Sequence, residues 1–309
     1  MNELQRYLAD EMVEEYQAGR LTRRELLRRI TLITGSVAMA EAFLAAARVT
    51  AEEPARGRAA AASARPAPQA GVTVSPDDPE IVAELVQFPG SGVTLQGYLA
   101  RPRREGPHAA VLQIHENIGL TEHHNDVSRR LAKAGYVGLA IDLLSRHGGT
   151  AAFADPAEVT AALSQMPPEQ LLDDLNAGVA FLQGLPYVRA TSVGVMGFCF
   201  GGGLTWRLIT LNRELRAAVP FYGPSPPLDA VPNIQAAVLG IYAGEDPRIN
   251  AGIPDLERAL QAAGKTFEFV IYPGAMHAFF NDTRPNYHPE AARDAWARTL
   301  DWFSRFLSA

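Results

Sequence analysis

The sequence contains one cysteine, Cys199, in 309 residues, so no disulfide can form within the chain. It also lacks an excess of positive charge: the net charge is −6, which gives no electrostatic attraction to nucleic acid. The apolar runs are too short and too polar for a permanent membrane span. With 47% apolar and 20% charged residues, the composition is that of an ordinary globular protein.

Residues 1–47 differ in character from the rest of the chain. Five arginines lie within residues 20–29, followed by a modestly apolar stretch and then alanines, which is the order of a signal peptide. The stretch "TRRELLR", with Arg23 and Arg24, resembles the twin-arginine export motif. It predicts a periplasmic protein that is bound and exported by a cellular export machinery. About twenty residues precede this motif, and Glu41 interrupts the apolar stretch. The alternative is a pair of amphipathic helices that stays attached to a cytoplasmic protein as an arm or a dimer contact.

Residues 48–80 are rich in Ala, Pro and Arg without any period, and they predict a flexible linker. From residue 81 to 309 the pattern becomes regular and predicts one catalytic domain. Apolar runs typical of strands occupy 80–88, 93–100, 109–115, 136–143, 191–198, 216–223, 236–244 and 266–273. Segments of helical period occupy 122–135, 168–185, 202–211, 253–264 and 289–307. This alternation predicts an α/β fold with a mostly parallel central sheet and helices on both faces, the first two strands forming an antiparallel pair at the edge.

Cys199 falls where a predicted strand meets a predicted helix, in "GFCFGG". A buried thiol is one interpretation, because free cysteine behaves as a small hydrophobe. The G-x-C-x-G pattern favours the other, a nucleophile elbow with Cys in place of the usual Ser. The helix that begins there would lower the pKa of the thiol and present free N–H groups to an anion.

An elbow nucleophile needs an acid and a base, in that order along the chain. Glu245 and Asp246 follow one predicted strand, and we favour Asp246, although adjacent carboxylates are hard to separate by sequence. His277 follows the last predicted strand and is the expected base, with His288 as the one competitor beyond the acid. The backbone N–H groups of Phe200 and Asn117 are the expected oxyanion donors.

No metal or cofactor is expected. The adjacent histidines of "EHHND" would point about 100° apart on a helix and could not easily share one ion. The glycine-rich stretch "GFCFGGG" lacks the Lys-Ser/Thr pair of a phosphate-binding loop.

The motifs "IHENIGL", "GYVGLAIDL", "GFCFGG", "AGEDPRI" and "YPGAMHAFFND" together resemble the dienelactone hydrolase (carboxymethylenebutenolidase) family over residues 82–309. The resemblance implies the α/β-hydrolase fold, hydrolysis of an ester or lactone, and a triad of Cys199, Asp246 and His277. It also implies that Glu116 contacts the resting thiol and helps to form the thiolate. From its position alone, Glu116 could equally be a structural residue.

The sequence departs from the family pattern where the family binds a substrate carboxylate. The family has an arginine four residues after the catalytic histidine, and this chain has Asn281 there. The second family arginine would lie between the fourth strand and the following helix, in residues 150–170, which contain none. Arg146 and Arg248 could replace these arginines, or each could form a surface ion pair.

These observations predict a cysteine hydrolase that acts on a small ester or lactone. Two other functions remain open. One is an exported binding protein that has kept the fold and lost turnover. The other is a cysteine acyltransferase that passes the acyl group to an acceptor other than water. The oligomeric state and the natural substrate cannot be deduced from the sequence.

Overall fold

A computed structural model describes residues 1–49 and 73–308 of the chain, so residues 50–72 of the predicted linker lie outside the described residues. The chain divides into two compact units, which we describe separately. One unit combines the N-terminal helices with Ala151–Pro168, and the other contains the remaining described residues from 73 onward. The division differs from the predicted single domain over 81–309, because an internal segment groups with the N-terminal helices.

The larger unit is built on one eight-stranded sheet. Its strands are β1 (Ile81–Gly90), β2 (Val93–Pro102), β3 (His108–Ile114), β4 (Val137–Asp142), β5 (Val188–Phe198), β6 (Ala217–Phe221), β7 (Ala237–Glu245) and β8 (Phe267–Met276). The strand order is β1-β2-β4-β3-β5-β6-β7-β8, with β1 and β2 antiparallel and every pair from β4 to β8 parallel. The predicted α/β fold and its antiparallel edge are confirmed.

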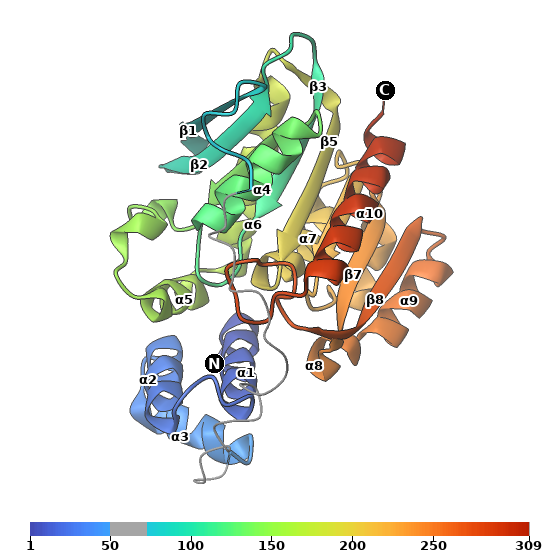
Figure 1. Ribbon diagram of the computed structural model, residues 1–309. Coiled ribbons are helices and arrows are strands. Elements are labelled where there is room, and N and C mark those ends of the chain that lie inside the picture. Colours follow the sequence, from blue (N-terminus) through green and yellow to red (C-terminus); the bar gives the residue numbers. More distant parts are fainter. Residues whose placement is uncertain (50–72, 309) are drawn as a thin grey trace. The chain divides into compact units, whose positions relative to one another are not determined.

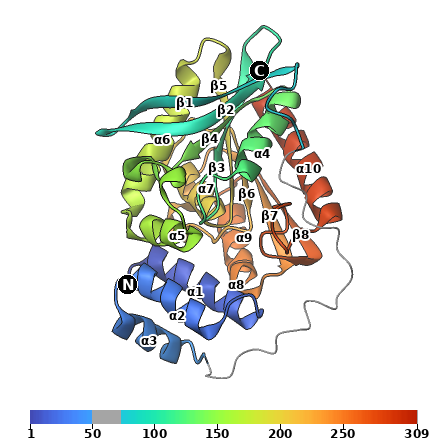
Figure 2. The same ribbon diagram turned by 60° about the vertical axis from the view of Figure 1, so that its left-hand side comes forward.

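Helices cover both faces of this sheet (Figures 1 and 2). The helices of this unit are α4 (Glu122–Lys133), α6 (Pro168–Gly184), α7 (Phe200–Leu211), α8 (Pro247–Asn250), α9 (Ile253–Ala262) and α10 (Pro289–Leu307). In Figure 1, α4 and α10 lie in front of the sheet and α6 and α7 behind it. Because both faces are covered, β3, β4 and β6 are buried along their whole lengths, which explains why most of their residues are apolar.

The larger unit includes residues that the sequence assigned to the linker. The backbone N–H groups of Thr73 and Val74 each donate to the buried carboxylate of Asp126 on α4, at 2.8 Å. Arg129 donates to the carbonyl oxygen of Val74 at 2.6 Å. A buried carboxylate must be hydrogen bonded, and this need orders a segment whose composition alone predicts a flexible chain.

The smaller unit consists of α1 (Glu3–Gln17), α2 (Arg23–Thr34), α3 (Val37–Ala46) and α5 (Pro156–Gln165). Leu26, Ile30 and Ile33 form the buried face of α2. Gln165 of α5 donates to the carbonyl oxygen of Ile33 at 2.7 Å and so satisfies a group that the end of α2 leaves without a partner. Helix α5 was not predicted from the sequence, although Asp155 before Pro156 is a typical helix start.

In the part of the chain that the structure describes, no single helix has the length and hydropathy needed to cross a bilayer. Helices α2 and α3 reach the threshold only when they are taken together, and a bend of 115° separates them.

The export signal stays a prediction, and Arg23 and Arg24 are the residues that test it. If they form a twin-arginine signal, the double change of both to lysine should leave the protein in the cytoplasm of its native host, because lysine keeps the charge and loses the guanidinium. Fractionation and the N-terminal mass measure the result, with the same double change at Arg28 and Arg29 as the control. Wild-type protein that keeps Met1 and stays in the cytoplasm would establish the helical arm instead.

Candidate active site

Cys199 stands at the turn between β5 and α7, with a backbone that L-residues rarely adopt. Its φ is 57° and its ψ is −116°. A non-glycine residue held at such angles costs about 1–3 kcal/mol, and this strain is typical of functional turns. The Cys199 N–H donates to the carbonyl oxygen of Phe221 on the neighbouring strand β6, at 3.0 Å. The turn is therefore fixed from outside in the geometry of a nucleophile elbow.

The two glycines of the motif are required by close backbone contacts. A Cβ at Gly197 would lie 2.2 Å from the carbonyl oxygen of Gly201. A Cβ at Gly201 would lie 2.5 Å from the carbonyl oxygens of Ile114 and His115, at the end of β3. Backbone atoms cannot move aside as a flexible side chain can. The first turn of α7 thus packs directly against the loop that follows β3.

Asp246 and His277 are hydrogen bonded to each other. The His277 Nδ1–H donates to Asp246 Oδ2 at 2.5 Å, and the sulfur of Cys199 lies within 4.8 Å of a ring nitrogen of His277. Of the two adjacent carboxylates, Asp246 is buried at the start of α8, whereas Glu245 is exposed. The competing His288 accepts from the N–H of Ala291 and caps α10.

The three residues come from three parallel strands, and the carboxyl ends of these strands lie on the same side of the sheet (Figure 1). Cys199 follows β5, Asp246 follows β7 and His277 follows β8. Ligands of open parallel sheets bind at the carboxyl ends of the strands.

The His277 turn is held by its neighbours. Ala278 has a φ of 62°, and Asn286 donates to the His277 carbonyl oxygen at 2.8 Å. The ring of Tyr222, a buried residue with a φ of 36°, lies 5.0 Å from the imidazole. Sequence reasoning missed Tyr222, whose only signal is its place directly after β6.

The pKa of His277 is determined by opposing effects. Burial alone lowers it, but the negative charge of Cys199 and the hydrogen bond to Asp246 outweigh burial and raise the pKa well above the ordinary value of 6.5. A raised pKa means that the folded protein favours the charged imidazolium, which keeps its proton until the pH rises through that higher value. The site therefore favours a charged imidazole beside the Cys199 sulfur.

This pairing predicts how alkylation of Cys199 depends on pH. An ordinary thiol has a pKa of about 8.5 and loses about tenfold in alkylation rate for each pH unit below it. With His277 protonated beside the sulfur, the rate with iodoacetamide should change by less than about threefold between pH of about 6.5 and 7.5. The rate is measured by quenching the labelling reaction at timed intervals and determining the alkylated fraction by mass spectrometry. A tenfold rise per pH unit through that range would show an unpaired thiol.

The loop after β3 carries Glu116 and Asn117, which are both buried. The Asn281 side-chain amide donates to Glu116 Oε2 at 2.6 Å. The backbone N–H of Thr283 donates to Asn281 Oδ1 at 3.0 Å and so fixes the direction of that amide. Asn281, predicted as a substrate-binding residue, is fully buried and uses its amide to hold Glu116.

Arg146 and Arg248 were predicted as replacement carboxylate anchors. Arg146 forms a bidentate ion pair with the buried Asp174, at 2.7 and 3.0 Å. Hydrogen bonding to Asp174 is the main cause that raises the pKa of Arg146. Arg146 therefore forms an ion pair, as the alternative expects, and its role as a carboxylate anchor stays a prediction. Arg248 is half-buried in α8, two residues after Asp246.

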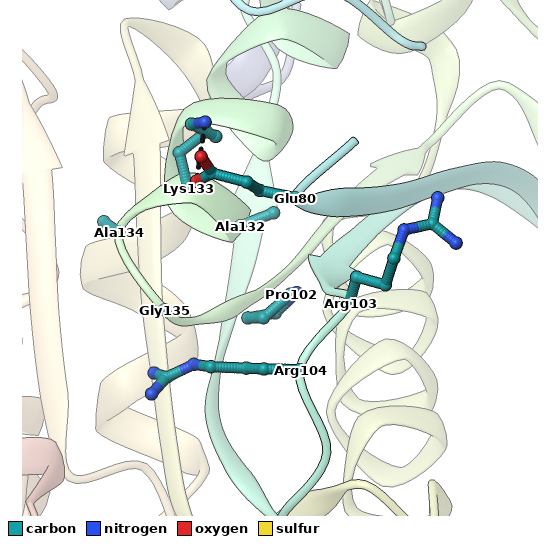
Figure 3. Close-up of a pocket in the computed structure, with 8 residues that line it drawn as sticks. All are labelled: Glu80, Pro102, Arg103, Arg104, Ala132, Lys133, Ala134 and Gly135. Carbon is teal, nitrogen blue, oxygen red and sulfur yellow. Dashed lines mark ion pairs between the residues drawn. The ribbon is translucent and has the colours of Figure 1, made fainter. Parts of the chain in front are cut away.

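A cavity of about 450 Å³ opens away from these carboxyl ends, near the end of β2 and the end of α4 (Figure 3). Its lining residues are Glu80, Pro102, Arg103, Arg104, Ala132, Lys133, Ala134 and Gly135. Lys133 and Glu80 pair across it at 2.8 Å, and Arg104 extends past Gly135 (Figure 3). The end of β2 lies beside the beginning of β4, so this cavity is remote from the carboxyl ends of the parallel strands.

The sequence profile of the dienelactone hydrolase family matches residues 95–307. The chain belongs to the dienelactone hydrolase family. A protein from Methylorubrum extorquens named "Putative carboxymethylenebutenolidase" is 37% identical over 249 residues, covering 77% of this chain and 86% of that protein. The protein of the same name from Escherichia coli K12 is 36% identical over 254 residues, covering 77% and 93%. The solved "Putative Dienelactone Hydrolase" of Klebsiella pneumoniae is 35% identical with a TM-score of 0.68, covering 73% and 99%.

The match places this dienelactone hydrolase family member among the hydrolases of the α/β-hydrolase fold. It begins within β2 and ends with the last residue of α10, so it contains every candidate site residue. Helices α1, α2 and α3 lie before the matched residues.

Proposed function

We propose that the protein hydrolyses the ester or lactone bond of a small molecule through a thioester formed on Cys199. The observation that carries this proposal is the cysteine held at a φ of 57° at the end of β5, next to an imidazole bound to a buried carboxylate. The strained turn presents the sulfur at the edge of the sheet, and the imidazole can hold the proton that the thiol loses. Membership of a hydrolase family supports the same chemistry.

In the acylation step, the Cys199 thiolate attacks the carbonyl carbon of the substrate and forms a carbon–sulfur bond. The carbonyl oxygen becomes an oxyanion, which the backbone N–H groups of Phe200 and Asn117 stabilise. When the carbonyl re-forms, the carbon–oxygen bond of the ester breaks, and His277 gives its proton to the leaving alkoxide. In a lactone this oxygen stays attached to the acyl chain.

In the deacylation step, neutral His277 takes a proton from water, and the resulting hydroxide attacks the thioester carbon. The second oxyanion collapses, the carbon–sulfur bond breaks, and the acid product leaves with the Cys199 thiolate restored. Asp246 accepts from Nδ1 throughout, so the other ring nitrogen faces the reacting atoms. The chain supplies every group for these steps, and the proposed reaction requires no cofactor.

The substrate class follows from the side chains that replace the family arginines. A charge-assisted hydrogen bond contributes about 1.5–3 kcal/mol, which is roughly a 10- to 150-fold factor in kcat/KM. Asn281 is neutral and bound to Glu116, and Arg146 is paired with Asp174. We therefore expect neutral short esters or lactones to be hydrolysed at least as well as a carboxylated dienelactone.

The comparison requires kcat/KM for both substrates at low and moderate salt, with the free acid identified as the product. A wild-type preference for the dienelactone by tenfold or more, weakening with salt, would contradict the expectation and point to Arg248 as a carboxylate anchor. Arg248→Gln would then remove the preference.

A further inference from the structure

Two buried histidines hydrogen bond to the backbone of Glu116, whose carbonyl belongs to the peptide group that carries a proposed oxyanion donor. The peptide between Glu116 and Asn117 contains the Glu116 carbonyl and the Asn117 N–H. His115 Nδ1 lies 2.7 Å from the Glu116 carbonyl oxygen. The N–H of Glu116 donates to His124 Nε2 at 3.3 Å. Both histidines are fully buried, one directly after β3 and the other in the first turn of α4.

The hydrogen bonds at the far nitrogen settle the proton position on His115. The N–H of Leu143, at the end of β4, donates to His115 Nε2 at 3.2 Å, so this nitrogen carries a lone pair. A neutral imidazole has one N–H, which must then be on Nδ1 and donate to the Glu116 carbonyl. Burial lowers the pKa of His115 and lowers that of His124 further, which keeps both rings neutral.

A hydrogen bond to the carbonyl of a peptide affects the N–H of the same planar group. Resonance ties the two atoms together, so the His115 bond fixes the plane of the peptide and strengthens its N–H as a donor. The preceding N–H is held by His124, and the Glu116 side chain is held by Asn281. The carbonyl oxygen, the N–H and the Oε2 atom of Glu116 are thus each held by a buried side chain.

We propose that His115 and His124 are positioning residues that orient the Asn117 N–H toward the oxyanion of the reacting ester. This inference rests on the proposed function, because it assigns a role within the same reaction. From the sequence, His124 was considered only as a possible metal ligand.

His115 is the residue to change, because two variants separate its contacts. His115→Leu removes both hydrogen bonds. His115→Asn places an amide N–H near the position of Nδ1 and so keeps the bond to Glu116 while it loses the acceptor for Leu143. His108→Leu is the matched control, since His108 is a buried histidine at the opposite end of the same strand.

The loss of an oxyanion donor costs about 10²–10³ in kcat, and a donor that remains but points wrongly should cost less. We expect His115→Leu to lower kcat for a neutral ester by about tenfold to a hundredfold with KM within about twofold, and His115→Asn to recover most of the loss. The rate of Cys199 alkylation by iodoacetamide should not change, because displacement at a saturated carbon forms no oxyanion. His124→Leu should lower kcat in the same way, and His124→Gln should restore it.

Three results would overturn the inference: an unchanged kcat in His115→Leu, a His115→Asn variant as slow as His115→Leu, or an alkylation rate that falls in parallel with kcat. A fall in kcat of the same size in His108→Leu would overturn it as well, because buried histidines at either end of β3 would then act only through stability. If the wild-type enzyme hydrolyses no ester, the proposed function itself fails. These outcomes are distinct from one another.

Discussion

Replacing Cys199 by alanine is expected to lower kcat for ester hydrolysis by about 10⁴-fold or more, because no other group at the elbow can form the acyl intermediate. The fold should survive, since the side chain is small and the turn is held by the Phe221 carbonyl and by close contacts at Gly197 and Gly201. Steady-state kinetics with a short aryl ester measure the loss. Thermal unfolding of the variant shows whether the loss reflects the chemistry.

Cys199→Ser is the matched variant. It keeps a nucleophilic atom at the same position but lacks the thiolate that pairs with a charged imidazole, so we expect activity between those of alanine and wild type. Because Cys199 is the only cysteine, one equivalent of iodoacetamide should label the native protein once and abolish hydrolysis. Full activity in the labelled protein would remove Cys199 from the mechanism.

Asp246→Asn should produce the second large effect, a loss of about 10³–10⁴ in kcat, because the amide removes the negative charge and can favour the wrong imidazole tautomer. Asp246 is buried and bound to Nδ1 of His277 at 2.5 Å, so its charge acts at short range. The control is Glu245→Gln, which makes the same chemical change one residue earlier. Glu245 is exposed, and we expect its variant to stay within about twofold of wild type.

The pair of variants also tests the pKa of His277. Loss of the Asp246 charge removes one cause of its raised pKa, so the imidazolium should lose its proton at a lower pH in Asp246→Asn. The alkylation rate should then depend on pH more steeply near neutrality. Equal losses in Asp246→Asn and Glu245→Gln would contradict the assignment of Asp246 as the orienting acid.

The strands and the elbow could be predicted from the sequence because they depend on local patterns. A strand buried on both faces is mostly apolar, as β3, β4 and β6 are. The elbow requires glycines two residues either side of the nucleophile, and the contacts of Gly197 and Gly201 show why. The family resemblance, stated on these motifs, is confirmed by the match over residues 95–307.

The residues that hold the site in place could not be predicted, because their roles depend on contacts between distant segments. Asn281 lies 165 positions from Glu116 and can be assigned to it only in the folded chain. His124 caps the backbone of Glu116 from a helix whose sequence also suggested a metal ligand. Asp246 and Glu245 differ in burial rather than in local pattern, so the sequence could favour one but not separate them.

The most direct test of a thioester mechanism is to trap the acyl group on the enzyme. Wild-type protein mixed with an excess of a short aryl ester is quenched in acid during turnover, digested, and analysed by mass spectrometry. The account predicts one acyl group per chain, carried on the peptide that contains Cys199 and absent from the Cys199→Ala protein. Steady turnover of the ester with no acyl group on Cys199, or with the group on another residue, would contradict it.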